Sequence, residues 1–246
     1  MSYAPTDYDF GDSSNYAFAE TITCANDEAR TMFVEAYGHM LNYNHEQAIA
    51  CFMKCTESDP NCAMAWWGIA YCLSSSYNWS AGLGPGYDAI QQAISVKDGC
   101  SELEQDLIMA LSTRHTKEAR DNANPAALNM GNSPELNQAF ADAMAPLYEK
   151  YSGNLDVTAI YVEALMNLNP WTLWNKDAST GEITPVDDST LMLIKIMEDA
   201  FESSDEAKVH PALCHLYCHA LELSPFPERA LPAADVLRTL MPGCGH

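Results

Sequence analysis

Residues 62–71 decide the fold, and they read CAMAWWGIAY. The run contains no proline and no charged residue, and it directly follows the breakers Asp59-Pro60-Asn61. An apolar run that begins after such a breaker predicts a buried helix, which we expect over residues 61–75. Trp66 and Ala70 stand one helical turn apart, so a large and a small side chain share a face and a second helix can approach closely.

The helical pattern continues along most of the chain, without a convincing alternating strand run. Segments rich in glycine, proline and asparagine separate the apolar stretches and mark the ends of helices. The expected helices are 27–41, 45–58, 61–75, 85–97, 101–119, 133–151, 154–168, 188–203, 208–223 and 227–240. The sequence therefore predicts an all-α fold.

Paired helices of this length indicate an internal repeat. The tetratricopeptide unit has about 34 residues, with large and small apolar residues at fixed offsets before a proline. Those offsets hold Met32, Ala36, Ala48, Phe52 and Cys55 before Pro60, and Cys214, Cys218, Ala230, Ala234 and Leu237 before Pro242. The agreement between distant units predicts an α-solenoid of tetratricopeptide-like helix hairpins over residues 27–246. Two inserted loops, Ser74 to Gly86 and Asn169 to Asp188, interrupt it.

Six runs go beyond the generic repeat: 43–48 (YNHEQA), 62–71 (CAMAWWGIAY), 163–171 (EALMNLNPW), 215–220 (HLYCHA), 227–230 (PERA) and 242–246 (PGCGH). With these runs the chain resembles a group of bacterial and algal tetratricopeptide proteins of poorly defined function, over about residues 35–245. The resemblance implies a right-handed α-solenoid. Members of the group usually continue past the residue that matches His246, so this chain resembles an N-terminal half or a shortened member.

Residues 1–26 differ in composition from the rest of the chain. They contain no lysine or arginine and are rich in tyrosine, aspartate and serine. We expect a flexible acidic tail, or one that is partly docked through Tyr8, Phe10, Tyr16 and Phe18.

The charge balance restricts the partners. The 34 acidic and 12 basic residues give a formal net charge of −22, which repels nucleic acid and anionic membranes and favours cationic partners or metal ions. No uncharged apolar stretch approaches the roughly 20 residues of a membrane-spanning helix. The nine cysteines form no C-x-x-C pair, so we expect reduced thiols and a cytoplasmic location.

The expected helix 208–223 carries the candidate metal ligands. His215, His219 and Glu222 are spaced i, i+4 and i+7 and share one face. Two histidines and a carboxylate suit a divalent ion such as Zn²⁺, and His246 would face the same groove. The alternative is a hydrogen-bonded histidine pair without metal. His39, His45 and His115 are interpreted as surface or capping residues.

Further residues are expected to line the concave groove, where repeat proteins of this kind bind ligands. They are Trp67, Tyr71, Tyr77, Asn78, Trp79, Glu163, Asn167, Trp171 and Trp174. Aromatic side chains of this kind anchor a peptide or a small ligand. The competing interpretations are filling of the inner side of the superhelix for Trp67 and Tyr71, and capping of an apolar edge for the loop residues. For Glu163 and Asn167 the alternative is a solvated or helix–helix polar contact.

No nucleophile motif, phosphate-binding loop or dinucleotide fingerprint occurs in the sequence. The first hypothesis is therefore a binding module whose groove recognises a peptide or protein segment of cationic character. The second is a metal- or ligand-binding protein, with enzymatic activity left open. The third is a subunit of an assembly, because a last repeat without a capping helix would expose apolar surface and favour oligomers.

Overall fold

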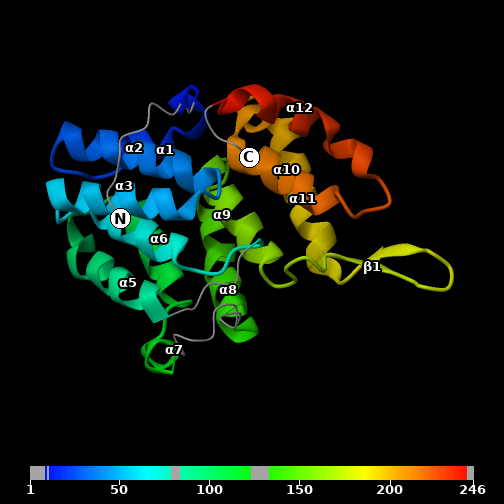
Figure 1. Cartoon of the computed structure of the whole chain (residues 1–246), viewed down its shortest axis with the longest axis horizontal. Coiled ribbons are helices and arrows are strands. Elements are labelled where there is room, and N and C mark those ends of the chain that lie inside the picture. Colours follow the sequence, from blue (N-terminus) through cyan, green and yellow to red (C-terminus); the bar gives the residue numbers. More distant parts are fainter. Residues whose placement is uncertain (1–8, 10, 79–83, 123–132, 243–246) are drawn as a thin grey trace.

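The computed structural model describes residues 9, 11–78, 84–122 and 133–242, and most of them are helical (Figure 1). The helices are α1 (Phe18–Thr21), α2 (Asp27–Leu41), α3 (His45–Ser58), α4 (Ala63–Cys72), α5 (Gly84–Val96), α6 (Glu102–Ser112), α7 (Lys117–Asp121), α8 (Pro134–Lys150), α9 (Leu155–Met166), α10 (Asp188–Ser203), α11 (Pro211–Leu221) and α12 (Leu231–Leu240). The expected all-α class is confirmed.

Local chemistry accounts for most helix boundaries. At the start of α2 the Asn26 side chain accepts a hydrogen bond from the Ala29 backbone N–H, and Ser101 and Glu104 form a capping box at the start of α6. The expected helix 101–119 is divided, because Thr116 caps a separate short helix, α7. The expected helix 227–240 begins as a 3-10 turn at Pro227–Ala230 before α12.

Consecutive helices pack against each other, most extensively α2 with α3, α4 with α5, and α3 with α4, followed by α8 with α9 and α11 with α12. Gly68 permits one close approach, because a Cβ atom there would lie 2.4 Å from the ring of Phe52 on α3. Helix α9 also contacts α10 and α11. It lies between the N-terminal helices and the C-terminal group in Figure 1.

Two aromatic residues in the described part of the N-terminal segment pack against the helices. Tyr16 and Phe18 are buried in the core, as the alternative of docking requires. The backbone N–H and the hydroxyl of Thr23 each donate to the Glu104 carboxylate at 2.7 Å. Tyr8 and Phe10 lie outside the described residues.

The second inserted loop contains the only β-strands among the described residues. Strands β1 (Trp174–Lys176) and β2 (Ile183–Pro185) form an antiparallel hairpin, with Trp174 opposite Pro185. Figure 1 shows the hairpin extending away from the helices. Hydrogen bonds from Ser179 and Thr180 to the Asp177 carboxylate close the turn and lower the pKa of Asp177. Three-residue strands leave too short an alternation for sequence analysis to detect.

No helix in the described ranges has both the length and the apolar character needed to cross a bilayer.

Candidate functional site

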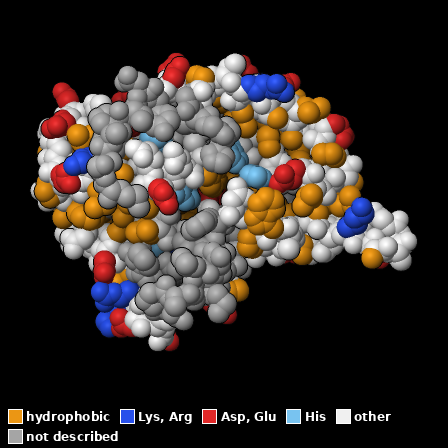
Figure 2. Space-filling model, in the orientation of Figure 1, with side chains coloured by type: hydrophobic (Ala, Val, Ile, Leu, Met, Phe, Trp, Pro, Cys, Tyr) orange, Lys and Arg blue, Asp and Glu red, His pale blue; other side chains and the backbone are white. Residues whose placement is uncertain are grey.

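A pair of histidines on α11 forms the centre of the candidate site. His210 caps the N-terminus of the helix: its ring nitrogen accepts from the Leu213 backbone N–H, and Pro211 is the first helical residue. His215 and His219 lie one turn apart, and their ring centroids are separated by 4.8 Å. Both are half-buried. Figure 2 shows histidine side chains near the middle of this face of the molecule, close to hydrophobic ones.

Three aromatic rings from distant segments join this pair. Tyr43, from the α2–α3 turn, lies 4.7 Å from His215. Tyr77, from the segment after α4, lies 5.3 Å from His219 and stacks on Trp171 at 5.3 Å. Trp171 follows α9 and meets His219 edge-on at 5.9 Å. We call these five residues the aromatic–histidine cluster.

Polar side chains engage both ring nitrogens of His219. Nδ1 lies 2.8 Å from Oε1 of Glu222, and Nε2 lies 3.2 Å from the amide nitrogen of Asn78. Across the described residues, His215, His219 and Glu222 do not form a set of three metal ligands with mutually close donor atoms. The fourth sequence-predicted ligand, His246, lies outside the described residues, as does Trp79.

The backbone is strained at two cluster residues. Tyr43 has φ +56° and Trp171 has φ +61°, the non-glycine residues with positive φ in the described ranges. Left-handed backbone costs a residue with a Cβ atom roughly 1–2 kcal/mol. Such strain persists only where the surroundings enforce it, and it concentrates at functional sites.

A buried polar network lies beneath the cluster. Tyr71 donates to Oε2 of Glu163 at 2.5 Å, and Tyr43 also donates to this carboxylate. Burial raises the pKa of Glu163, and these hydrogen bonds together with the charge of Arg114 oppose that rise. Asn167 also bonds to Glu163 and is 3% exposed. A cavity of about 20 Å³ beside Tyr43, Tyr71 and Glu163 is large enough for about one water molecule.

Arg114 is the cation of this network. Its Nε and Nη2 donate to Oδ1 of Asn137 at 3.0 and 2.7 Å, and Asn137 donates to the Asn167 carbonyl at 2.8 Å. Burial lowers the pKa of Arg114. Opposite charges on Arg114 and Glu163 limit the cost of placing either one in the interior.

Trp67 and Trp174, two of the residues expected to line the groove, form hydrogen bonds between elements of the fold. Trp67 is 1% exposed, and its indole N–H donates to the Leu107 carbonyl at 3.2 Å. Trp174 belongs to β1, donates to the Ala220 carbonyl at 2.7 Å and meets Phe226 edge-on. The Trp67 indole N–H therefore connects α4 to α6, and that of Trp174 connects β1 to α11.

A second set of side chains, on α2 and α3, was missed by sequence analysis. One donor atom from each of Glu35, His39 and Cys51 lies within 4.8 Å of the other two, close enough to hold a metal ion. His39 and His115 are 0% and 2% exposed, so the interpretation of them as surface residues is wrong. Burial lowers the pKa of His39 to about 4. The detectable signal is the i, i+4 spacing of Glu35 and His39.

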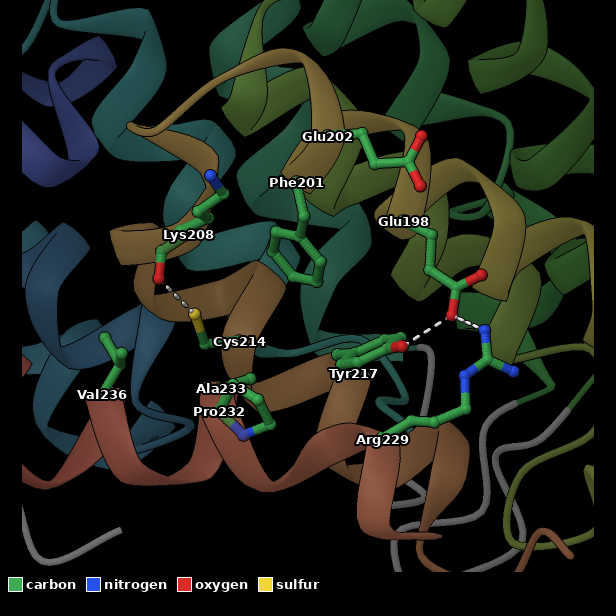
Figure 3. Close-up of a pocket in the computed structure, with 10 residues that line it drawn as sticks. All are labelled: Glu198, Phe201, Glu202, Lys208, Cys214, Tyr217, Arg229, Pro232, Ala233 and Val236. Atoms are coloured by element: carbon green, nitrogen blue, oxygen red, sulfur yellow. Dashed lines mark hydrogen bonds and ion pairs between the residues drawn. The ribbon is translucent and has the colours of Figure 1, made fainter. Parts of the chain in front are cut away.

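A cavity of about 460 Å³ opens between α10, α11 and α12 (Figure 3). Phe201, Pro232 and Val236 supply apolar walls. At one end Tyr217 donates to Glu198 at 2.6 Å, and Arg229 pairs with the same carboxylate. No motif in the sequence indicates this cavity.

Comparison with known proteins gives no further guide to identity: no protein-family model, no curated protein and no solved structure matches this chain.

Proposed function

We propose that this chain is a binding module whose aromatic–histidine cluster holds a lysine- or arginine-rich segment of a partner protein. In this proposal the helix hairpins form a right-handed tetratricopeptide-like solenoid, and the cluster lies on its concave side. The observation that carries the proposal is the exposed ring of Trp171, which stacks on Tyr77 and meets His219 edge-on. His219 in turn contacts the Glu222 carboxylate.

The ring of Trp171 suits a cationic side chain. Trp171 is 52% exposed, which is unusual for the largest apolar side chain. The face of an indole attracts an ammonium or guanidinium group through its quadrupole. Stacking on Tyr77 restricts the ring, so a ligand loses less conformational entropy when it binds.

The charges favour the same ligand. Glu222 is exposed beside the cluster, and its carboxylate reaches His219. The chain as a whole carries a formal net charge of −22. Such a surface attracts cationic peptides and disfavours nucleic acids.

Titration of the full chain with short fluorescent peptides tests the proposal. We expect a lysine-rich peptide to bind and a glutamate-rich peptide of the same length not to bind. Affinity should fall at least about tenfold between low and high salt, because opposite charges contribute to binding. Equal binding of the two peptides, or none of the lysine-rich one, would overturn the proposal.

Two variants locate the site. Trp171→Ala should weaken binding about tenfold or more, equivalent to about 1.4 kcal/mol. The matched control is Leu191→Ala, which removes another exposed apolar side chain, 49% exposed, from α10. Wild-type affinity of Trp171→Ala would exclude the cluster as the binding site.

A cytoplasmic location is part of the proposal. The cysteines in the described ranges are all free thiols, and several are buried in the core. Reduced thiols are typical of that compartment.

Divalent metal binding is the second candidate function. The close donor atoms of Glu35, His39 and Cys51 favour it, whereas both ring nitrogens of His219 have other contacts. Association of chains through α12 is a third candidate, supported by the 60% exposure of Leu231.

A further inference from the structure

The α2–α3 hairpin brings three side chains with different donor atoms together. Glu35 and His39 stand four residues apart on α2 and share a face of that helix. Cys51 lies on α3, the next helix in the chain, which packs closely on α2. One carboxylate oxygen, one imidazole nitrogen and the sulfur all lie within 4.8 Å of one another.

These separations are compatible with one tetrahedral ion. Bond lengths of about 2.0–2.3 Å to zinc place tetrahedral ligands roughly 3.3–3.8 Å apart. Rotations of the Glu35 and Cys51 side chains would bring the donor atoms from within 4.8 Å of one another to this tetrahedral separation. Because α2 and α3 already hold both backbones, little additional order is needed.

The donor set selects the kind of ion. A thiolate and an imidazole favour zinc and similar transition metals, whereas calcium and magnesium require oxygen ligands. One thiolate and one carboxylate neutralise the two charges of the ion. The acidic surface of the chain further favours the approach of a cation.

Burial and neighbouring contacts restrict the three side chains. His39 is 0% and Cys51 1% exposed, whereas Glu35 is half-buried and is the most accessible of the three. The Asn44 side-chain amide lies 3.3 Å from Nδ1 of His39, and the Asn44 backbone N–H donates to the His39 carbonyl at 3.0 Å. A ligating imidazole donates its other ring N–H to an acceptor, so binding of an ion through Nε2 requires the Asn44 side chain to turn its amide oxygen toward Nδ1.

We propose that Glu35, His39 and Cys51 bind one Zn²⁺ ion between α2 and α3. The three protein ligands leave a fourth coordination position for water, as in zinc sites that are not purely structural. The site uses none of the residues of the aromatic–histidine cluster. It therefore stands independently of the peptide-binding proposal.

Cobalt is the probe, because Co²⁺ replaces zinc and absorbs visible and near-ultraviolet light. The full chain, stripped with a chelator and kept reduced, is titrated with Co²⁺ and then with Zn²⁺. We expect one Co²⁺ per chain, visible bands of tetrahedral intensity, a thiolate-to-cobalt charge-transfer band, and loss of all bands when zinc is added. The absence of any cobalt band, or a stoichiometry well below one, would overturn the proposal.

Three substitutions assign the ligands. Cys51→Ser should remove the charge-transfer band. His39→Ala should weaken cobalt binding beyond the roughly 10–100-fold typical of outer contacts. Glu35→Gln alters a half-buried side chain and should leave the fold intact. Because it removes the carboxylate ligand but not the thiolate, it should weaken cobalt affinity at least tenfold and keep the charge-transfer band.

Cys55→Ser is the matched control. Cys55 lies one turn further along α3, is 0% exposed, and donates to the Ala29 carbonyl at 3.2 Å. Its substitution should leave cobalt affinity and the charge-transfer band unchanged. Loss of the band in Cys55→Ser with retention in Cys51→Ser would show that other thiols hold the metal. Far-ultraviolet circular dichroism of every variant establishes that it is folded.

Discussion

The phenol of Tyr71 on α4 donates a 2.5 Å hydrogen bond to the carboxylate of Glu163 on α9, 92 residues later in the chain. Both side chains are buried, at 7% exposure each. The bond connects the first helix pairs to the centre of the molecule and places a carboxylate beneath the aromatic–histidine cluster.

Removal of this donor should destabilise the fold. Tyr71→Phe leaves a buried carboxylate with one hydrogen bond fewer, and we expect a loss of about 1.5–3 kcal/mol in the free energy of unfolding. Urea denaturation measures it. Tyr151→Phe is the control, because Tyr151 donates to Asp106 at 2.6 Å in a partly exposed position. Its cost should stay below about 1 kcal/mol, and equal costs would contradict the role assigned to Tyr71.

The close approach of α3 and α4 should not tolerate a methyl group. In Gly68→Ala the new Cβ would lie 2.4 Å from the buried ring of Phe52, and overpacking of this kind costs about 1–3 kcal/mol. The loss of stability would appear as a lower midpoint temperature of thermal unfolding. Gly99→Ala is the control, since no atom lies within 4 Å of a Cβ there. A Gly68→Ala variant as stable as Gly99→Ala would show that the helices can separate without cost.

The strain at Trp171 can be measured apart from the loss of its ring. Trp171→Gly and Trp171→Ala both remove the indole, but only glycine relaxes φ +61°. We expect the glycine variant to be about 1 kcal/mol more stable than the alanine variant. At the neighbouring Thr172, which has no such φ, alanine should be at least as stable as glycine. The same order at both positions would argue against stored strain.

Acid should destabilise the protein through His45. Burial lowers the pKa of His45 to about 4, below the value of about 6.5 of an unfolded chain. Between these values the unfolded state binds one more proton than the folded state, so stability is present above pH 6.5 and is lost as the pH falls toward 4. The contribution to the slope is at most about 1.4 kcal/mol per pH unit.

His45→Gln should remove this contribution, which chemical denaturation at a series of pH values would measure. Glu46→Gln, an exposed neighbour, should give a curve parallel to that of the wild type between about pH 5 and 6.5. An unchanged slope in His45→Gln would mean that His45 is protonated in the folded state.

Much of the local structure could be predicted from the sequence. Three helices, α2, α3 and α10, begin and end at the expected residues, because caps and prolines act within one helical turn. The β1–β2 hairpin was not predicted, since three-residue strands carry almost no periodic signal. Docking of Tyr16 and Phe18 remained only an alternative, because composition does not reveal which apolar side chains find a partner.

The candidate sites, too, could be predicted from the sequence only in part. Helical spacing alone placed His215 and His219 on one face of α11. It could not show that Tyr43 and Trp171, from two turns far apart in the chain, would meet them. Nor could it show that His39 would be buried near Cys51, because that depends on how α2 packs against α3.

The sequence by itself determined where helices form, which faces of them are apolar, and that the surface is strongly acidic. Tertiary structure alone decided which polar groups share the interior. Tyr37 and Asp156, 119 residues apart, are joined by a 2.7 Å hydrogen bond for which no local pattern provides a signal. The physical reason is range: capping and periodicity act over about one turn, whereas side-chain contacts follow from the simultaneous packing of all the helices.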